Sequence, residues 1–185
     1  MGNLRDLSRF DAQFFGVHTR QAHTLDPQQR LLMERAYEAI FDAGYDPSEF
    51  RGQKVGVFVG SCVSESGWIC SCDTDKIAAF GLLGSSMGML SNRVSYAMDF
   101  IGPSVTVDTA CSSTMVALNQ AVLAIRSGQC EAAVVGGSSL VLLPTSSLGF
   151  ALMQVLSPDG KCRVFDANLA TPRSALVVRR RGGGW

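Results

Sequence analysis

The sequence reads Val105-Thr106-Val107-Asp108-Thr109-Ala110-Cys111-Ser112-Ser113 where a β-rich run reaches a cysteine and passes at once into a helical pattern. Apolar residues then recur at helical spacing up to Arg126, and Gly128 is the glycine that commonly follows a helix end. We therefore expect a helix from Ser112 to Arg126, with Cys111 on the corner between strand and helix.

A thiol at a helix N-terminus lies beside backbone N–H groups that have no partner within the helix. The helix dipole favours an anion there by roughly 0.3–1 kcal/mol, so the position should lower the pKa of the thiol and activate Cys111 as a nucleophile. The same N–H groups can stabilise an oxyanion. The alternative is that Cys111 is an inert small hydrophobe, as most free cysteines are.

The flanking residues favour the catalytic interpretation. Asp-Thr-Ala-Cys-Ser-Ser, after a Gly102-Pro103-Ser104 turn, resembles the nucleophile segment of β-ketoacyl synthases, the condensing enzymes of fatty-acid and polyketide synthesis. Other segments resemble the same family in the same order: Phe14–His18, Gln21–Leu32, Ser91–Tyr96, Val134–Gly137 and Leu156–Asp166. The resemblance covers nearly everything from Leu4 to about Asn168.

Within that family the chain looks most like the large multifunctional fatty acid synthase of animals. Gly16-Val17-His18 and Gln21-Ala22-His23-Thr24 stand where polyketide synthases more often have Gly-Ile-Ser and a different loop. The segment from Val55 to Ser61, leading into Ser64-Glu65-Ser66, also fits the animal type.

The resemblance implies a thiolase-like α/β fold, of which this chain holds most of the N-terminal half only, as a mixed sheet flanked by helices. It implies that Cys111 is the nucleophile, carries the acyl group and gives its backbone N–H to the oxyanion. The partners would be an acyl carrier protein, whose phosphopantetheine delivers acyl and malonyl thioesters, and a second copy of the complete parent. This region would itself bind no cofactor and no metal.

The family's two catalytic histidines and supporting lysine belong to its second half, and their roles cannot be transferred to any residue here. The histidines of this sequence are His18 and His23, which match positions in a structural loop. We therefore expect the isolated chain to be inactive. The alternatives are a polyketide synthase module, a thiolase-like acyltransferase, and a non-catalytic fragment that binds an acyl chain or another subunit.

Composition agrees with one globular core, since 46% of the 185 residues are hydrophobic and the formal net charge is +0. Balanced charge argues against nucleic acid as the main partner. The sequence contains neither a run of about 18 apolar residues nor a secretory leader, so we expect no membrane span and a cytoplasmic location. The six cysteines lack the paired spacing of a zinc site, and Cys62, Cys70 and Cys72 are interpreted as reduced loop thiols.

Helices and strands are expected to alternate. Asp26 can cap a helix that starts at Pro27 and closes at Gly44, with a buried stripe of Leu32, Met33, Ala36, Tyr37, Ile40 and Phe41. Residues 55–60 and 131–136 are predicted to be buried strands, and Ile77 to Met98 a helix broken near its glycines. Strands joined by such helices predict a parallel or mixed sheet.

Two local patterns are given structural interpretations. Gly84-Ser85-Ser86-Met87-Gly88 matches the nucleophile elbow of hydrolases, but we expect close packing of small residues because no strand precedes it and no histidine follows it. After Asn168 the sequence departs from the family, ending in Arg179-Arg180-Arg181 and three glycines before Trp185. We predict a ketosynthase region over 1–168 and a divergent, disordered tail over 169–185.

Overall fold

The computed structural model describes residues 4, 6–72, 80–157 and 160. The chain divides into two compact units, and one of them runs from Ser8 to Leu140. The other combines residues 1–7 with residues 141–181, and its described part contains α7 (Pro144–Leu152). The predicted tail over 169–185 and Cys162 lie outside the described residues.

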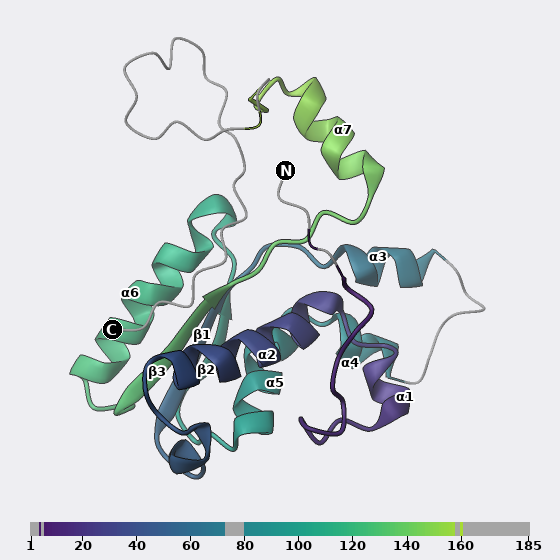
Figure 1. The fold of residues 1–185 in the computed structure, drawn as a ribbon. Coiled ribbons are helices and arrows are strands. Elements are labelled where there is room, and N and C mark those ends of the chain that lie inside the picture. The colour runs from purple at the N-terminus through teal and green to yellow at the C-terminus, as the bar shows by residue number, and fades with distance from the viewer. Residues whose placement is uncertain (1–3, 5, 73–79, 158–159, 161–185) are drawn as a thin grey trace. The chain divides into compact units, whose positions relative to one another are not determined.

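A parallel sheet of three strands forms the centre of the Ser8–Leu140 unit (Figure 1). The strands are β1 (Val55–Gly60), β2 (Ser104–Val107) and β3 (Ala132–Gly137), in the spatial order β2-β1-β3. Gly60 pairs with Val107 on one side and with Gly137 on the other. The three predicted strands are present, but β3, which is expected to be buried, is only half-buried and ends in an exposed residue. All of the pairings are parallel, as helical crossovers require.

Alternation along β1 explains the layers on the two faces of the sheet. Val55, Val57 and Val59 point into a core shared with α2 (Pro27–Asp42) and α5 (Met89–Met98). Phe58 points the opposite way, into a core shared with α6 (Ser113–Arg126). The sheet is therefore covered by α2 and α5 on one face and by α6 on the other (Figure 1). Every residue of β1 is buried, in keeping with its central place.

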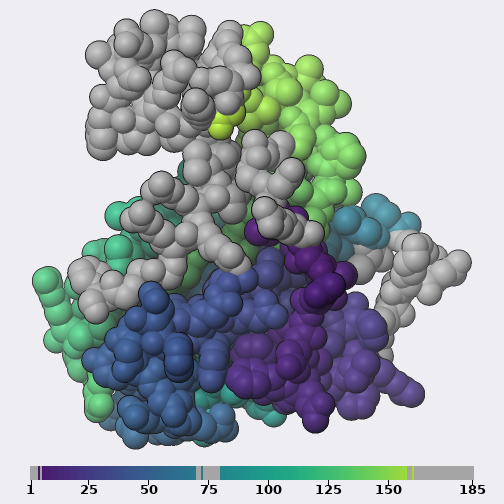
Figure 2. Space-filling view, viewed as in Figure 1, coloured from purple at the N-terminus to yellow at the C-terminus, as the bar shows by residue number. Residues whose placement is uncertain are grey.

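The remaining elements are short. They are α1 (Thr19–Ala22), α3 (Glu65–Ser71), α4 (Gly81–Ser85) and the 3₁₀ turns η1 (Pro47–Phe50) and η3 (Ala110–Ser112). In the space-filling view the early part of the unit, purple and blue, forms one continuous surface (Figure 2). No helix in the described parts of the chain has both the length and the apolar character needed to cross a bilayer.

Helix α2 begins as predicted. The side chain of Asp26 accepts a hydrogen bond from the Gln28 N–H at 2.7 Å, Pro27 is the first helical residue, and Gly44 follows the end with φ +87°. The expected stripe is confirmed for Ala36 and its buried neighbours but is wrong for Phe41, which is 70% exposed. Residues four positions apart are offset by about 40° around the helix axis, so a stripe with this spacing drifts around the helix. Phe41, at the end of the stripe, therefore faces away from the sheet.

One other local expectation needs correction. Cys70 lies within α3 and Cys72 caps its end, so this segment is a helix rather than a loop. The signal for it is Ser64, whose side chain accepts from the Gly67 N–H at 3.3 Å as an N-cap does. The helical region before Met98 is broken as predicted, into the two helices α4 and α5, which are separated at residues 86–88. Ile77, its predicted first residue, lies outside the described residues.

Candidate active site

The chain leaves β2 through a tight turn that leads to Cys111. Ala110 has φ +54°, a left-handed conformation that is uncommon for a residue with a side chain. Its N–H donates to Oδ1 of Asp108 at 3.0 Å. Such a conformation costs on the order of 1–3 kcal/mol and persists where the surroundings enforce it, which is often at functional sites.

Ser113 and Ser112 enforce this turn. The buried hydroxyl of Ser113 accepts from the Thr109 N–H at 2.9 Å and donates to the Ala110 carbonyl at 2.6 Å. The hydroxyl of Ser112 donates to the Thr109 carbonyl at 2.7 Å. The two serines of the Cys-Ser-Ser motif therefore hydrogen-bond both backbone groups of Thr109 and the carbonyl of Ala110. These bonds make the turn that leads to Cys111 rigid.

Cys111 lies in η3, which continues directly into α6, and its side chain is exposed. The prediction of a strand-to-helix corner is confirmed, with one 3₁₀ turn interposed between strand and helix. An exposed thiol at the start of a 14-residue helix is accessible to a substrate and lies close to the positive end of the helix. The roles of Cys111 as nucleophile and oxyanion donor stay predictions.

The first turn of α6 is seated against the carboxyl ends of two strands. A Cβ on Gly60, the last residue of β1, would collide with the backbone of Ser113 and Thr114. A Cβ on Gly137, the last residue of β3, would collide with the hydroxyl of Thr114. At Gly60 the backbone of the helix itself approaches the strand end, and at Gly137 the Thr114 side chain does, so neither position has room for a Cβ unless its neighbour shifts.

A second thiol lies near Cys111, and no local pattern in the sequence indicates it. Cys62 follows β1, and the N–H of the preceding Ser61 donates to the Val107 carbonyl at 3.0 Å, beside the start of the turn that leads to Cys111. Partial burial raises the pKa of the Cys62 thiol, and the nearby charges of Asp108 and Cys111 raise it further. The pairing of β1 with β2 is what brings Cys62 to the site.

The two histidines stand at the two ends of the short helix α1. Nδ1 of His18 accepts from the Arg20 N–H at 3.2 Å and caps α1, and His23 stands at the other end of that helix. The small residues near Ser86 also pack closely, since a Cβ on Gly84 would collide with the Thr24 carbonyl. The segment before Ser86 is the helix α4, not the strand that a nucleophile elbow needs.

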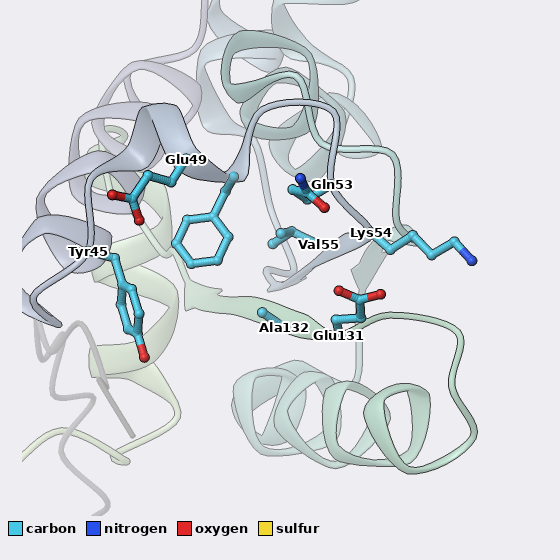
Figure 3. A pocket seen from close by; sticks show the side chains of 8 residues that line it. Tyr45, Glu49, Gln53, Lys54, Val55, Glu131 and Ala132 are labelled. Carbon is cyan, nitrogen blue, oxygen red and sulfur yellow. The ribbon is translucent and has the colours of Figure 1, made fainter.

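A shallow pocket of about 240 Å³ lies at the opposite end of the sheet (Figure 3). It is lined by the first residues of β1 and β3, Val55 and Ala132, together with side chains that include Tyr45, Lys54 and Glu131. Because Cys111 follows the carboxyl end of a parallel strand, this pocket faces away from the thiol. We assign it no part in the chemistry of Cys111.

Comparison with known proteins adds independent evidence. The family model of the β-ketoacyl synthase N-terminal domain matches residues 1–170. A fatty acid synthase from the goose Anser anser anser is 52% identical over 167 residues, which are 90% of this chain and 47% of that protein. A phenolphthiocerol/phthiocerol polyketide synthase of Mycobacterium tuberculosis is 44% identical over 164 residues, which are 89% of this chain and 9% of that protein.

Solved structures show the same fold. A ketosynthase from module 6 of the bacillaene synthase of Bacillus subtilis superposes with a TM-score of 0.75 at 34% identity, covering 89% of this chain and 28% of its own. An oxazolomycin ketosynthase domain from Streptomyces albus superposes with a TM-score of 0.78 at 36% identity, covering 90% of this chain and 29% of its own. The chain thus spans less than half of each of these relatives. It carries the N-terminal domain of a β-ketoacyl synthase and belongs to that family, with the thiolase-like fold of the ketosynthases.

Proposed function

We propose that this chain supplies the nucleophile of a decarboxylative condensing enzyme of the fatty acid synthase type. The Cys111 thiolate attacks the carbonyl carbon of an acyl thioester, forms an acyl-cysteine and releases the carrier thiol. A malonyl thioester then loses carbon dioxide, and its carbanion attacks the acyl carbon and expels the Cys111 thiolate. The observation that carries this proposal is the exposed thiol on a rigid turn at the start of α6.

The Cys111 backbone N–H is proposed as one donor to the oxyanion that forms during acyl transfer. Removing such a donor typically costs about 10²–10³-fold in rate. The acyl groups would arrive on the phosphopantetheine of an acyl carrier protein, and the complete enzyme would be a homodimer. A cytoplasmic location suits this chemistry because a thiol nucleophile needs a reducing compartment.

The polyketide synthase alternative performs the same chemistry. It is supported by polyketide synthase relatives that are 42–44% identical over most of this chain, compared with 52% for the goose fatty acid synthase. The higher identity favours the fatty acid type. Both alternatives assign the same role to Cys111.

The 185-residue chain by itself is proposed to be inactive in condensation. General acid–base help of the kind that the family's two histidines give is typically worth about 10²–10⁴-fold, and the histidines of this chain, His18 and His23, lie before α2. Self-acylation of Cys111 needs only the thiolate and a neighbouring N–H, so it can persist slowly.

Two measurements test the function. Brief, substoichiometric alkylation followed by peptide mass spectrometry should label Cys111 before the thiols of Cys62 and Cys72. Incubation with an acyl thioester should add the acyl group to Cys111, and Cys111→Ala should abolish the adduct while Cys62→Ala keeps it. An adduct that persists in Cys111→Ala would overturn the assignment.

A further inference from the structure

Two adjacent glutamines at the start of α2 are almost completely buried. Gln28 is 1% exposed and Gln29 is 0% exposed, although a buried amide is costly unless it is hydrogen-bonded. Their side chains leave the helix in different directions and reach different parts of the unit. The partners of each amide therefore show what it holds in place.

Gln28 joins the segments that follow β1 and β3. Its Nε2 donates to the Val63 carbonyl at 2.8 Å, and its Oε1 accepts from the Ser138 hydroxyl at 2.7 Å. The same Nε2 also donates to Oδ2 of Asp26 at 3.3 Å, and that oxygen accepts from the Ser64 hydroxyl at 2.6 Å. One amide thus links the start of α2 to residues 35 and 110 positions further along the chain.

Both of these segments border the candidate nucleophile. Ser61 is hydrogen-bonded to Val107, the last residue of β2 before the turn that leads to Cys111. Cys62 lies within reach of the charge of Cys111. The N–H of Ser138 donates to the Gly60 carbonyl at 3.0 Å, next to the contact of Gly60 with α6. A shift of residues 61–64 would therefore change the surroundings of the thiol without touching α6.

We infer that Gln28 is a positioning residue for acyl transfer, which fixes residues 61–64 beside Cys111 by joining Val63 to Ser138. This inference rests on the proposed function of Cys111. Glutamine suits the place because one side chain must both donate and accept. Glutamate would lose the donor and would place a second carboxylate beside Asp26, and methionine would fill the volume with neither donor nor acceptor.

Gln29 provides a matched control in the same helix. Its Nε2 donates to the Leu83 and Ser86 carbonyls at 3.2 and 3.3 Å, around the end of α4. Its contacts therefore lie outside residues 61–64 and 138. Gln28→Met and Gln29→Met remove the same chemical group at equal burial, but from different segments.

Hydrogen–deuterium exchange of the 185-residue chain tests the structural step. Gln28→Met should speed exchange about fivefold per lost hydrogen bond in peptides that cover residues 61–71, and Gln29→Met should do so in peptides that cover 80–88. Ser138→Ala removes one bond from the same amide with little change in volume. Ser138→Ala should speed exchange at residues 61–71 by less than Gln28→Met does. It replaces Gln28→Met in this test if that variant does not fold.

Acyl transfer tests the functional step, in this chain or in the enzyme completed with the family's second half. The rate of Cys111 acylation should fall at least about fivefold in Gln28→Met. In Ser138→Ala, which removes one hydrogen bond of the same amide, the rate should fall by about fivefold at most. Gln29→Met should stay within about twofold of the wild type. Alkylation of Cys111 by iodoacetamide, which needs no bound acyl chain, should be the same in all variants.

The outcomes separate the two proposals. Equal exchange at 61–71 in Gln28→Met and Gln29→Met, or equal acylation rates in these two variants, would overturn the inference about Gln28 and leave the role of Cys111 intact. Failure of the wild-type protein to acylate Cys111 would overturn the proposed function, and with it the purpose assigned to Gln28.

Discussion

Gly60 and Thr114 are in direct backbone contact, which seats the start of α6 on the end of β1. Thr114 also contacts Gly137 at the end of β3, so one helical residue occupies the space that two missing side chains leave. The position of Cys111, three residues before Thr114, depends on this contact. The glycines at the ends of two neighbouring strands are therefore part of how the site is built.

We predict that Gly60→Ala distorts the start of α6. The added methyl meets backbone rather than a flexible side chain, so the helix must shift, at a cost of about 1–3 kcal/mol in the free energy of unfolding. Urea denaturation of the 185-residue chain measures that cost. Gly81→Ala is the control, since a Cβ there meets nothing within 4 Å. Equal stability of the two variants would show that the contact does not constrain the fold.

Asp26→Ala should destabilise the chain more than Asp46→Ala. Both residues cap a helix through their side chains, but Asp26 is 2% exposed and also accepts the Ser64 hydroxyl. Loss of the cap costs roughly 0.5–2 kcal/mol, and the lost hydrogen bond from the partly buried Ser64 hydroxyl to the carboxylate adds about 1–3 kcal/mol. Thermal or urea unfolding of the two variants gives the comparison, and a larger loss for Asp46→Ala would contradict it.

The alkylation of Cys62 should depend on pH in a way that reveals its neighbours. The pKa of this thiol is raised by burial and by the charges of Asp108 and Cys111, so its reactive thiolate forms only at higher pH than usual. Cys111→Ala or Asp108→Asn removes one of these charges and should move the rate profile of Cys62 to lower pH. Peptide mass spectrometry across a pH series measures it; an unchanged profile in both variants would refute the proximity.

The isolated chain should self-associate through the outer face of α6. The buried face of this helix carries small residues, while Met115 and Leu123 are 68% and 55% exposed. Exposed large apolar side chains on one face favour association. Replacing both by Gln should lower the average mass in light scattering coupled to size-exclusion chromatography. Ile101→Gln, at 63% exposure outside α6, should change it less.

Sequence patterns predict the local elements well because the signals are local. Asp26 and Pro27 mark a helix start through the backbone groups they satisfy or lack, and β1 is visible in the apolar residues between Val55 and Gly60. The corner at Cys111 follows from a β-branched run that changes to helical spacing. The motif around Cys111 predicts the family without any knowledge of the fold, and the comparisons confirm it.

The features that the sequence could not determine depend on which segments meet. Cys62 lies near Cys111 only because β1 pairs with β2. Thr114 requires glycine at positions 60 and 137 only because α6 crosses both strand ends. Neither relationship leaves a pattern in the residues next to it along the chain.

The sequence by itself therefore determined the long helices α2 and α6, the three strands and the identity of the candidate nucleophile, through hydrophobic periodicity, capping and a family motif. The tertiary structure alone decided what surrounds that nucleophile. Gln28 reads as one more polar residue in a helical run until its amide is found hydrogen-bonded to Ser138, 110 residues away. Such contacts have no local signature, because a buried amide takes its partners from whichever strands and loops the packing of the sheet brings to it.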